Sequence, residues 1–474
     1  MPHLGRTTDR RAAKLTLVHE EPRTAPLRIG IVSASMGAGH DGAAAELSRR
    51  LTADGHTVDR WDLLDLLPAR AGRAAGSLYH RLLEHAPWVY QRIYTGTEHA
   101  GGAGPAARAL LRTAQERVLR ALPADTAAVV STYPGASHVL GRLRLAGKLT
   151  IPAVTYLTDF SVHPLWVARG IDLHLAVHEV PAAQARALGA AGVQVCGPVT
   201  DPRFRPPRAG ERAAARDRFG LLPGVRYALL VAGSWGVGPV RRVAAEIRAC
   251  GVAVPVVVCG RNQALARRLA ADGIEHVHGW TDDMPNLMWA CDVMVQNAGG
   301  LTSLEAFASG LPVVSYRCIP GHGAANAAAL DEAGVARWIR DAAGLPAALD
   351  DLMDGGPGLR QRISGLSLFP ADPALGPTAA IVGARLPAGH SAPAAVKTAA
   401  DARGRPGARG RHRPAVRLAA TFAAATAVWG GAVGTAVATG HEAPVLLRAL
   451  EHRIDPDARK TAHPAVVPVT ESLR

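Results

Sequence analysis

Short apolar runs alternate with longer segments of helical periodicity along most of the first 380 residues. In the first pair, an apolar run at 27–33 leads through a glycine-rich turn into a segment where Ala44, Leu47 and Leu51 recur at helical spacing as far as Ala53. Continuous apolar runs of this length are typical of parallel strands that are buried on both faces. The pattern therefore predicts a parallel sheet with strands at 27–33, 57–61, 127–131, 153–157 and 173–177.

The alternation pauses at the proline-rich segment 199–207 and then starts again. Further apolar runs, each followed by helical or loop sequence, predict strands at 227–231, 255–259, 276–279, 293–296 and 313–316. Two repetitions of the strand–helix pattern predict an α/β fold of two doubly wound, Rossmann-like domains. We place the first domain at 27–198 and the second at 199–380.

The pattern is different at both ends of the chain. Residues 1–26 have no apolar signal segment and are expected to form a disordered leader, whereas 381–417 resemble a Pro/Gly/Arg-rich linker. The uncharged stretch 418–440 is long enough to span a bilayer, and the arginines before it favour a cytoplasmic catalytic half. A soluble Ala-rich helix or a disordered tail is the alternative for this stretch, and 441–474 form a tail of unassigned role.

Charge and cysteine content narrow the classes of partner and compartment. Lys and Arg exceed Asp and Glu by 14. This positive charge suits anionic lipid or phosphate-bearing ligands, but a GC-rich coding bias would also produce many arginines. The basic residues are dispersed, and no segment stands out as a helix that would contact the bases of DNA. Nucleic acid is therefore disfavoured as a partner. The five cysteines form no CxxC pair, which argues for a reducing compartment.

A glycine-rich turn joins the first strand to the first helix. The run from Gly37 to Gly42 matches GxGxxG, and Asp62 follows about 20 residues later, as in dinucleotide-binding folds. That fingerprint does not need His40, which lies in the turn itself and could meet a substrate hydroxyl as a base. A plain tight turn beside a surface histidine is the alternative.

A second glycine-rich element follows the strand at 293–296. Gly299, Gly300 and Thr302 lie at the start of a helix, where freed backbone N–H groups can hold a diphosphate. Glu305 lies one turn further on the same helix face, where a carboxylate can accept hydrogen bonds from ribose hydroxyls. A glycine pair that only packs strand against helix is the alternative. Two anion cradles, one in each domain, favour an enzyme with an interdomain cleft.

Several ordered motifs resemble one family over about residues 28–380. NAGGLTSLEAFASGLPVVSY and IPGHGAANAAALDEAG resemble the donor-binding half of diacylglycerol glycosyltransferases, the monogalactosyldiacylglycerol synthase-like enzymes. SASMGAGHDGAAAEL resembles their opening loop, LTDFSVHPLW their Thr-Asp-x-x-x-His-x-x-Trp stretch, and VCGRNQAL and GWTDDMPNLMWACDV their nucleotide segments. The peptidoglycan N-acetylglucosaminyltransferase is a more distant relative. The resemblance implies the GT-B fold, in which two Rossmann-like domains face a cleft.

The resemblance also implies a site. His40 and Asp159 would be catalytic, as alternative acceptors of the proton from the acceptor hydroxyl, and Gly39, His163 and Trp166 would line the acceptor side of the cleft. The donor would be bound by Gly233, Gly236, Gly238, Arg261, Asn262, Thr281, Gly299, Gly300, Leu301, Thr302, Glu305, His322 and Asn326. We expect no cofactor besides the UDP-sugar, and no metal site; His276 and His278 are interpreted as strand residues.

Two loops depart from the family pattern. The family commonly has Gly-Gln-Glu after Ile-Pro, at a turn that contacts the donor hexose, whereas this chain has Gly321, His322 and Gly323. Trp235 stands where relatives often have a small residue. The segment 78–94 mixes Leu, Trp and Tyr with arginines, and relatives carry a similar stretch beside the lipid acceptor site; a core helix broken at Pro87 is the alternative.

The sequence therefore predicts a hexosyltransferase that uses a UDP-sugar and a lipid acceptor, diacylglycerol first. It would work at the cytoplasmic face of the membrane, near anionic lipid, either peripherally or anchored through 418–440. An NAD-dependent oxidoreductase built on Gly37–Gly42 and Asp62 is one alternative. A non-catalytic, membrane-tethered protein that binds nucleotide-sugar or lipid is the other.

Overall fold

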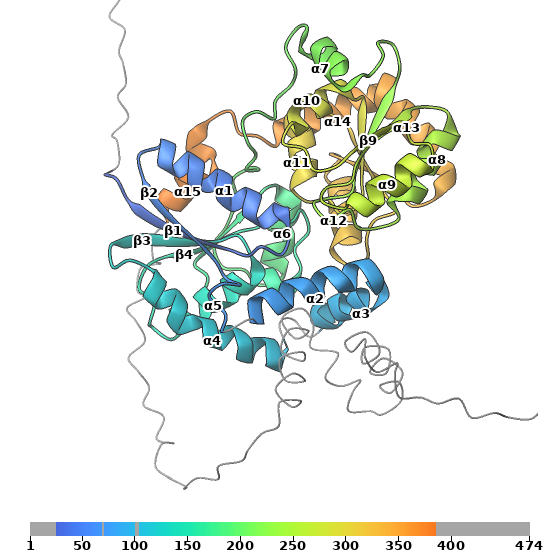
Figure 1. Ribbon diagram of the computed structural model, residues 1–474. Coiled ribbons are helices and arrows are strands. Elements are labelled where there is room, and N and C mark those ends of the chain that lie inside the picture. The colour runs from blue at the N-terminus through green and yellow to red at the C-terminus, as the bar shows by residue number, and fades with distance from the viewer. Residues whose placement is uncertain (1–24, 69–70, 100–103, 385–474) are drawn as a thin grey trace, which may run out of the picture.

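The computed structural model describes residues 25–68, 71–99 and 104–384 (Figure 1). The expected linker, transmembrane helix and tail all lie outside these ranges, as does nearly all of the expected leader. No helix within the described ranges is long and apolar enough to cross a membrane.

The first domain contains a six-stranded parallel sheet in the order β2-β1-β3-β4-β5-β6. Its strands are β1 (Arg28–Ser33), β2 (Thr57–Asp62), β3 (Thr126–Ser131), β4 (Ala153–Tyr156), β5 (Leu173–Ala176) and β6 (Val193–Val195). The connecting helices are α1 (Ala38–Ala53), α2 (Ala71–His85), α3 (Pro87–His99), α4 (Pro105–Ala121), α5 (Pro134–Leu145) and α6 (Glu179–Ala187), with a 3-10 turn, η1, at Pro164–Trp166. This confirms the predicted doubly wound α/β domain.

The second domain repeats the plan with strand order β12-β11-β10-β7-β8-β9. Its strands are β7 (Tyr227–Val231), β8 (Val254–Val258), β9 (His276–His278), β10 (Val293–Gln296), β11 (Val313–Tyr316) and β12 (Arg337–Ile339). Its helices are α7 (Glu211–Phe219), α8 (Val240–Cys250), α9 (Gln263–Ala271), α10 (Met284–Ala290), α11 (Leu301–Ala308), α12 (His322–Glu332), α13 (Leu345–Asp354) and α14 (Gly356–Ser367), with 3-10 turns at Ala342–Gly344 (η2) and Pro373–Leu375 (η3).

The strands are buried on both faces, which explains why they appear in the sequence as continuous apolar runs. In β7, Leu229 packs into the layer that contains α10 and α11, whereas the next residue, Leu230, packs into the layer that contains α8 and α13. Each of these side chains is buried. Alternate residues of one strand therefore serve two apolar layers, and no polar position is left in between.

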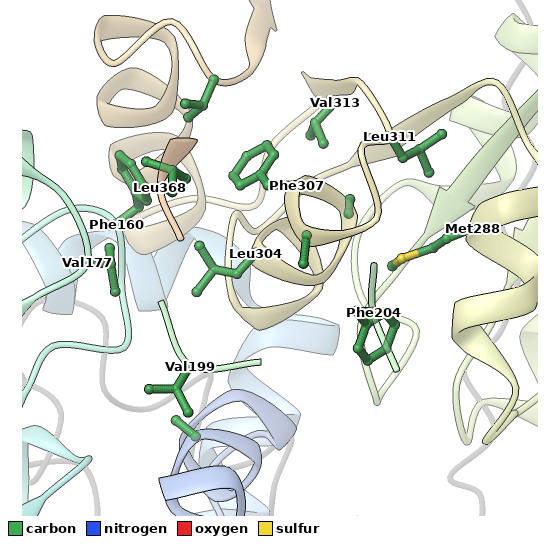
Figure 2. Close-up of a cluster of buried hydrophobic side chains, with 14 of the residues drawn as sticks. Phe160, Val177, Val199, Phe204, Met288, Leu304, Phe307, Leu311, Val313 and Leu368 are labelled. Atoms are coloured by element: carbon green, nitrogen blue, oxygen red, sulfur yellow. The ribbon is translucent and has the colours of Figure 1, made fainter. Parts of the chain in front are cut away.

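The two domains share one apolar cluster (Figure 2). Phe160 and Val177 from the first domain and Leu304 and Phe307 from α11 belong to it, and Val199 and Phe204 of the connecting segment lie in the same cluster. A final helix, α15 (Pro377–Gly383), at the end of the range expected for the second domain, packs back against α1 and β3 of the first domain. The domains are thus joined by packing as well as by chain connection.

Two local features differ from the sequence interpretation. Helix α1 begins at Ala38, three residues early, so that five of the six residues from Gly37 to Gly42 are helical. The edge strands β6 and β12 were not predicted, because three residues at a half-exposed edge leave little apolar signal. The segment 78–94 forms parts of two helices, α2 and α3, with the break at Ala86 just before Pro87, which agrees with the alternative of a helix broken at Pro87.

Candidate active site

A cleft of about 630 Å³ lies where the two domains face each other. Loops at the carboxyl ends of β1, β4, β7 and β10 line it, which is where open parallel sheets place their ligand sites. The structure brings together thirteen of the predicted site residues along this cleft: Gly39, His40, Asp159, His163, Trp166, Gly233, Thr281, Gly299, Gly300, Leu301, Thr302, Glu305 and His322.

Five predicted donor-binding residues do not line the cleft. Gly236 and Gly238 have left-handed backbones, and a Cβ on them would lie 2.7 Å from the Cys259 carbonyl oxygen and 2.5 Å from the Asn297 side chain respectively. Glycine at these two positions allows the loops to pack closely. Three polar side chains outside the cleft have other partners: Asn262 caps α9, Arg261 lies 4.5 Å over the ring of Trp280, and Asn326 bonds to Ser161 and to the Ala298 carbonyl.

His40 is held in a defined orientation. Its Nδ1 lies 2.9 Å from the carbonyl oxygen of Thr132 and 2.9 Å from the hydroxyl of Thr158. A carbonyl only accepts, so the first contact requires the proton on Nδ1 and leaves Nε2 as the basic nitrogen. Because His40 lines the cleft, this tautomer provides a proton acceptor for a hydroxyl bound there.

Asp159 and His163 have different roles in the same wall. One carboxylate oxygen of Asp159 accepts a hydrogen bond from the indole N–H of the buried Trp166 at 3.0 Å. His163 accepts from the Leu165 amide through Nδ1, and its Nε2 lies 3.2 Å from the Tyr94 carbonyl. Both imidazole nitrogens of His163 are thus used by the protein, and burial lowers its pKa. His163 is therefore a neutral structural residue of the wall.

The start of α11 lies where the sequence predicted an anion cradle, with two changes. The side chain of Gln296 accepts hydrogen bonds from the amides of Ala298 and Gly299, so those two N–H groups are not free for phosphate. Gly300 is the N-cap and has no side-chain cap, and the Ser303 amide donates to the Gly300 carbonyl, which leaves the amides of Leu301 and Thr302 as the candidate anion donors at the cleft. The buried Ser303 hydroxyl, which also lines the cleft, has no hydrogen-bond partner within the described part of the chain.

Glu305 lies on the same helix, deep in the cleft. Burial raises its pKa to about 7, with a further increase from the charge of Asp201 and an opposing effect of Arg203. A carboxylate that is poorly solvated gains more from two hydroxyl donors than one in water. The site therefore favours a vicinal diol at Glu305, and the hydroxyls of a ribose have this geometry.

The glycine-rich motif at Gly37–Gly42 does not have the geometry of a dinucleotide site. A Cβ on Gly42 would lie 2.4 Å from a side-chain carbon of Leu301, so this glycine makes room for α11 of the other domain. The carboxylate of Asp62 accepts from the amides of Ser35 and Leu64, which fixes the loop. The acidic residue that would bind a dinucleotide ribose is thus already occupied, and it does not line the cleft.

Sequence reasoning missed the residues that orient the predicted ones. Thr132 and Thr158 fix His40, and Tyr90 lies 2.9 Å from Nδ1 of His322 through its hydroxyl. Thr132 follows β3 directly, so its position at a strand carboxyl end was an available signal. Tyr90 carried no comparable signal, because its contact spans 232 positions in the sequence. Across the described residues, no group of three or more His, Cys, Asp or Glu side chains is arranged to hold a metal ion.

Comparison with known proteins finds one matching glycosyltransferase family model within each domain. The monogalactosyldiacylglycerol (MGDG) synthase family model matches residues 40–199, and the group 1 glycosyl transferase model matches 236–354. These matches cover the walls of the cleft that contain His40 and Glu305 respectively.

Curated relatives are described as diacylglycerol glucosyltransferases. A processive diacylglycerol beta-glucosyltransferase of Bacillus subtilis is 27% identical over 216 residues, which are 44% of this chain and 56% of the relative. A protein of the same name from Bacillus pumilus is 28% identical over 200 residues, 40% of this chain and 51% of the relative. The match thus spans only about half the length of these relatives.

Similar solved structures include MurG of Acinetobacter baumannii and the Anabaena protein HepE in complex with UDP. The first is 16% identical with a TM-score of 0.44, covering 75% of this chain and 99% of MurG. The second is 13% identical with a TM-score of 0.45, covering 72% of this chain and 94% of HepE. The two family matches and the curated relatives confirm the resemblance predicted from the motifs: this chain is similar to the diacylglycerol glycosyltransferases and carries glycosyltransferase domains in both halves.

Proposed function

We propose that this chain is a glycosyltransferase of the GT-B type that moves a hexose from a UDP-sugar to the hydroxyl of a lipid acceptor, diacylglycerol first. One observation carries the proposal. A single cleft has an oriented histidine base, His40, in the wall of one domain, and an uncapped helix start with Glu305 in the wall of the other. One wall can remove the proton from the acceptor hydroxyl, and the other can bind the donor that carries the group to be transferred.

The donor half would be held by α11 and the loop before α10. The two candidate amides at the start of α11 and the Ser303 hydroxyl supply hydrogen-bond donors for the diphosphate, and Glu305 accepts from the ribose hydroxyls. Trp280, which is about half exposed, and Thr281 line the same side, where the indole face can pack on the base.

The proposed reaction uses a base in one wall of the cleft and hydrogen-bond donors in the other. His40 Nε2 removes the proton from the acceptor hydroxyl as its oxygen forms a bond to the anomeric carbon of the sugar. The bond from that carbon to the diphosphate oxygen breaks, and the electron pair leaves with UDP. The α11 amides stabilise the negative charge that develops on the leaving diphosphate.

Between the two predicted bases, the geometry supports His40 over Asp159. One oxygen of Asp159 is already engaged by Trp166, whereas the hydrogen bond from His40 to the Thr132 carbonyl leaves its second nitrogen basic. Asp159 then acts as an acceptor-side residue whose carboxylate orients the substrate hydroxyl. Replacing Asp159 with Asn is expected to lower turnover less than replacing His40.

A lipid acceptor is supported by the apolar side chains of α2 and α3. Tyr79, Leu83, Tyr90 and Tyr94 line the cleft, where Tyr79, Leu83 and Tyr90 are buried, and Trp88 at the start of α3 is 58% exposed. The buried side chains give the cleft an apolar wall, and an exposed tryptophan suits the boundary between headgroups and acyl chains. The named activity of the Bacillus relatives points to the same acceptor. We propose peripheral action at a membrane surface.

The proposal is tested by UDP release from a panel of UDP-sugars, with and without diacylglycerol vesicles. His40→Ala and Glu305→Ala are compared with His99→Ala and Glu332→Ala, whose side chains are exposed and do not line the cleft. Lipid-dependent release that is lost only in the first pair supports the transferase. UDP binding without release from any sugar would instead establish a non-catalytic binding protein.

A further inference from the structure

Two loops of the second domain reach across the cleft to the same pair of helices, α2 and α3. The ring of Trp235 lies 4.8 Å from His80 and 5.8 Å from Tyr79 on α2, in edge-on arrangements. His322 bonds to the hydroxyl of Tyr90 on α3 at 2.9 Å. Trp235 also packs against the apolar core of the first domain.

Each loop contributes one ring side chain, Trp235 or His322, that meets an aromatic partner on the α2–α3 pair. The two loops and the helix pair are therefore matched across the cleft.

The turn at Gly321 is fitted closely to α3. Its amide donates to the side-chain carbonyl of Gln91, and a Cβ at position 321 would lie 2.9 Å from the ring of Tyr90 and 3.0 Å from the ring of Tyr94. The backbone at Gly321 is also left-handed, with φ 72°. Glycine is thus required for the turn to lie against these rings.

The contact to Tyr90 orients the imidazole of His322. Since Nδ1 is used by the phenol, Nε2 is the nitrogen left for a ligand, and His322 lines the cleft. His40 and Asp159 line the same cleft as His322. A donor hexose bound between α11 and His40 would therefore occupy the space that His322 also lines.

We propose that Tyr90 and Gln91 of α3 are positioning residues that fix His322 and the Gly321 turn, and thereby determine which hexose the cleft accepts. The proposal rests on the proposed function, because it concerns the sugar of the donor. It assigns a role in donor selection to a helix of the acceptor-side domain. A substitution on α3 would then change donor preference without touching the nucleotide.

The test measures dissociation constants of UDP, UDP-glucose and UDP-galactose by calorimetry, with turnover of both sugars as a second readout. The variants are Tyr90→Phe, Gln91→Ala, Gln91→Glu and His322→Ala. Tyr227→Phe is the matched control, because it removes a buried tyrosine hydroxyl that accepts from the Leu222 amide, away from the cleft. Gln91 is exposed, so its variants test the proposal even where Tyr90→Phe impairs folding.

We expect Tyr90→Phe and Gln91→Ala to change the ratio of the two sugar affinities by roughly three- to tenfold, the effect of one hydrogen bond. UDP affinity should stay constant, and Gln91→Glu, which keeps an acceptor oxygen, should restore the ratio. In the His322→Ala background, Tyr90→Phe should have no further effect.

An unchanged ratio in both α3 variants would overturn the inference, as would a parallel loss of UDP and UDP-sugar affinity. Calorimetry separates this result from failure of the proposed function. A chain that binds both sugars but releases no UDP from either would refute the transferase while leaving the donor ratio measurable. A chain that binds neither sugar would refute both.

Discussion

At the scale of single residues, His40 has a side chain whose orientation and tautomer are both defined by hydrogen bonds. Its Nδ1 proton is assigned by the Thr132 carbonyl, so the other nitrogen is left to act as a base. In His40→Asn, the amide N–H can still donate to that carbonyl while the base is lost. We expect kcat to fall at least about 100-fold with the KM for UDP-sugar nearly unchanged. Steady-state kinetics check this, and retention of most activity would refute His40 as the base.

Glu305 should make nucleotide binding depend on pH. Its pKa of about 7 falls when ribose hydroxyls donate to it, so binding releases a proton. UDP affinity should therefore rise as pH increases through 7 and then level off. Calorimetry between pH 6 and 8 measures this rise, and Glu305→Gln should remove the part of it that does not come from UDP itself. An identical pH profile in the variant would contradict the role of Glu305.

The same carboxylate should cost stability in the absence of ligand. Its folded pKa of about 7 lies above the ordinary value of 4.5, so the charged form is disfavoured in the folded state. The cost is absent below about pH 4.5, grows as pH rises towards 7, and is complete above it. At pH 8 we expect the free energy of unfolding of Glu305→Gln to be about 1 to 3 kcal/mol larger than that of the parent. The variant should therefore unfold at a higher temperature. The two proteins should melt alike near pH 4.5.

At the scale of elements, the turn into α11 depends on one of its two glycines. Gly299 has a left-handed backbone, and a Cβ there would lie 2.6 Å from Cβ of Asn326, whereas Gly300 has free space around its α-carbon. Gly299→Ala is expected to destabilise the protein by about 1 to 3 kcal/mol, and Gly300→Ala by much less. Chemical denaturation of both variants checks this, and equal effects would refute the assignment.

At the scale of the whole molecule, Asn326 joins the two domains. Its carbonyl oxygen accepts from the backbone and hydroxyl of Ser161 in the first domain, and its amide donates to the Ala298 carbonyl in the second. Asn326→Ala should therefore loosen the cleft and increase the radius of gyration measured by X-ray scattering. Gln361→Ala is the control, because its buried amide bonds to Val313 within one domain. An equal increase in both variants would show general unfolding rather than domain opening.

The sequence by itself determined ten of the twelve strands in the described residues, the doubly wound plan and the two glycine-rich turns at the cleft. Buried parallel strands require continuous apolar runs, and glycines are needed where a strand turns into a helix near a ligand, so both leave local signals. His40 and Glu305 could be predicted as candidate site residues for this reason, since each lies in or just after a recognisable glycine-rich turn.

Only the tertiary structure decided what the glycines and polar groups do once the domains meet. Gly42 makes room for Leu301, Asn326 bonds to Ser161 of the other domain, and Tyr90 orients His322 across the cleft. Each of these contacts joins residues more than 150 positions apart. Their partners are fixed by how two separate sheets pack together, and periodicity and spacing within one segment carry no information about that packing.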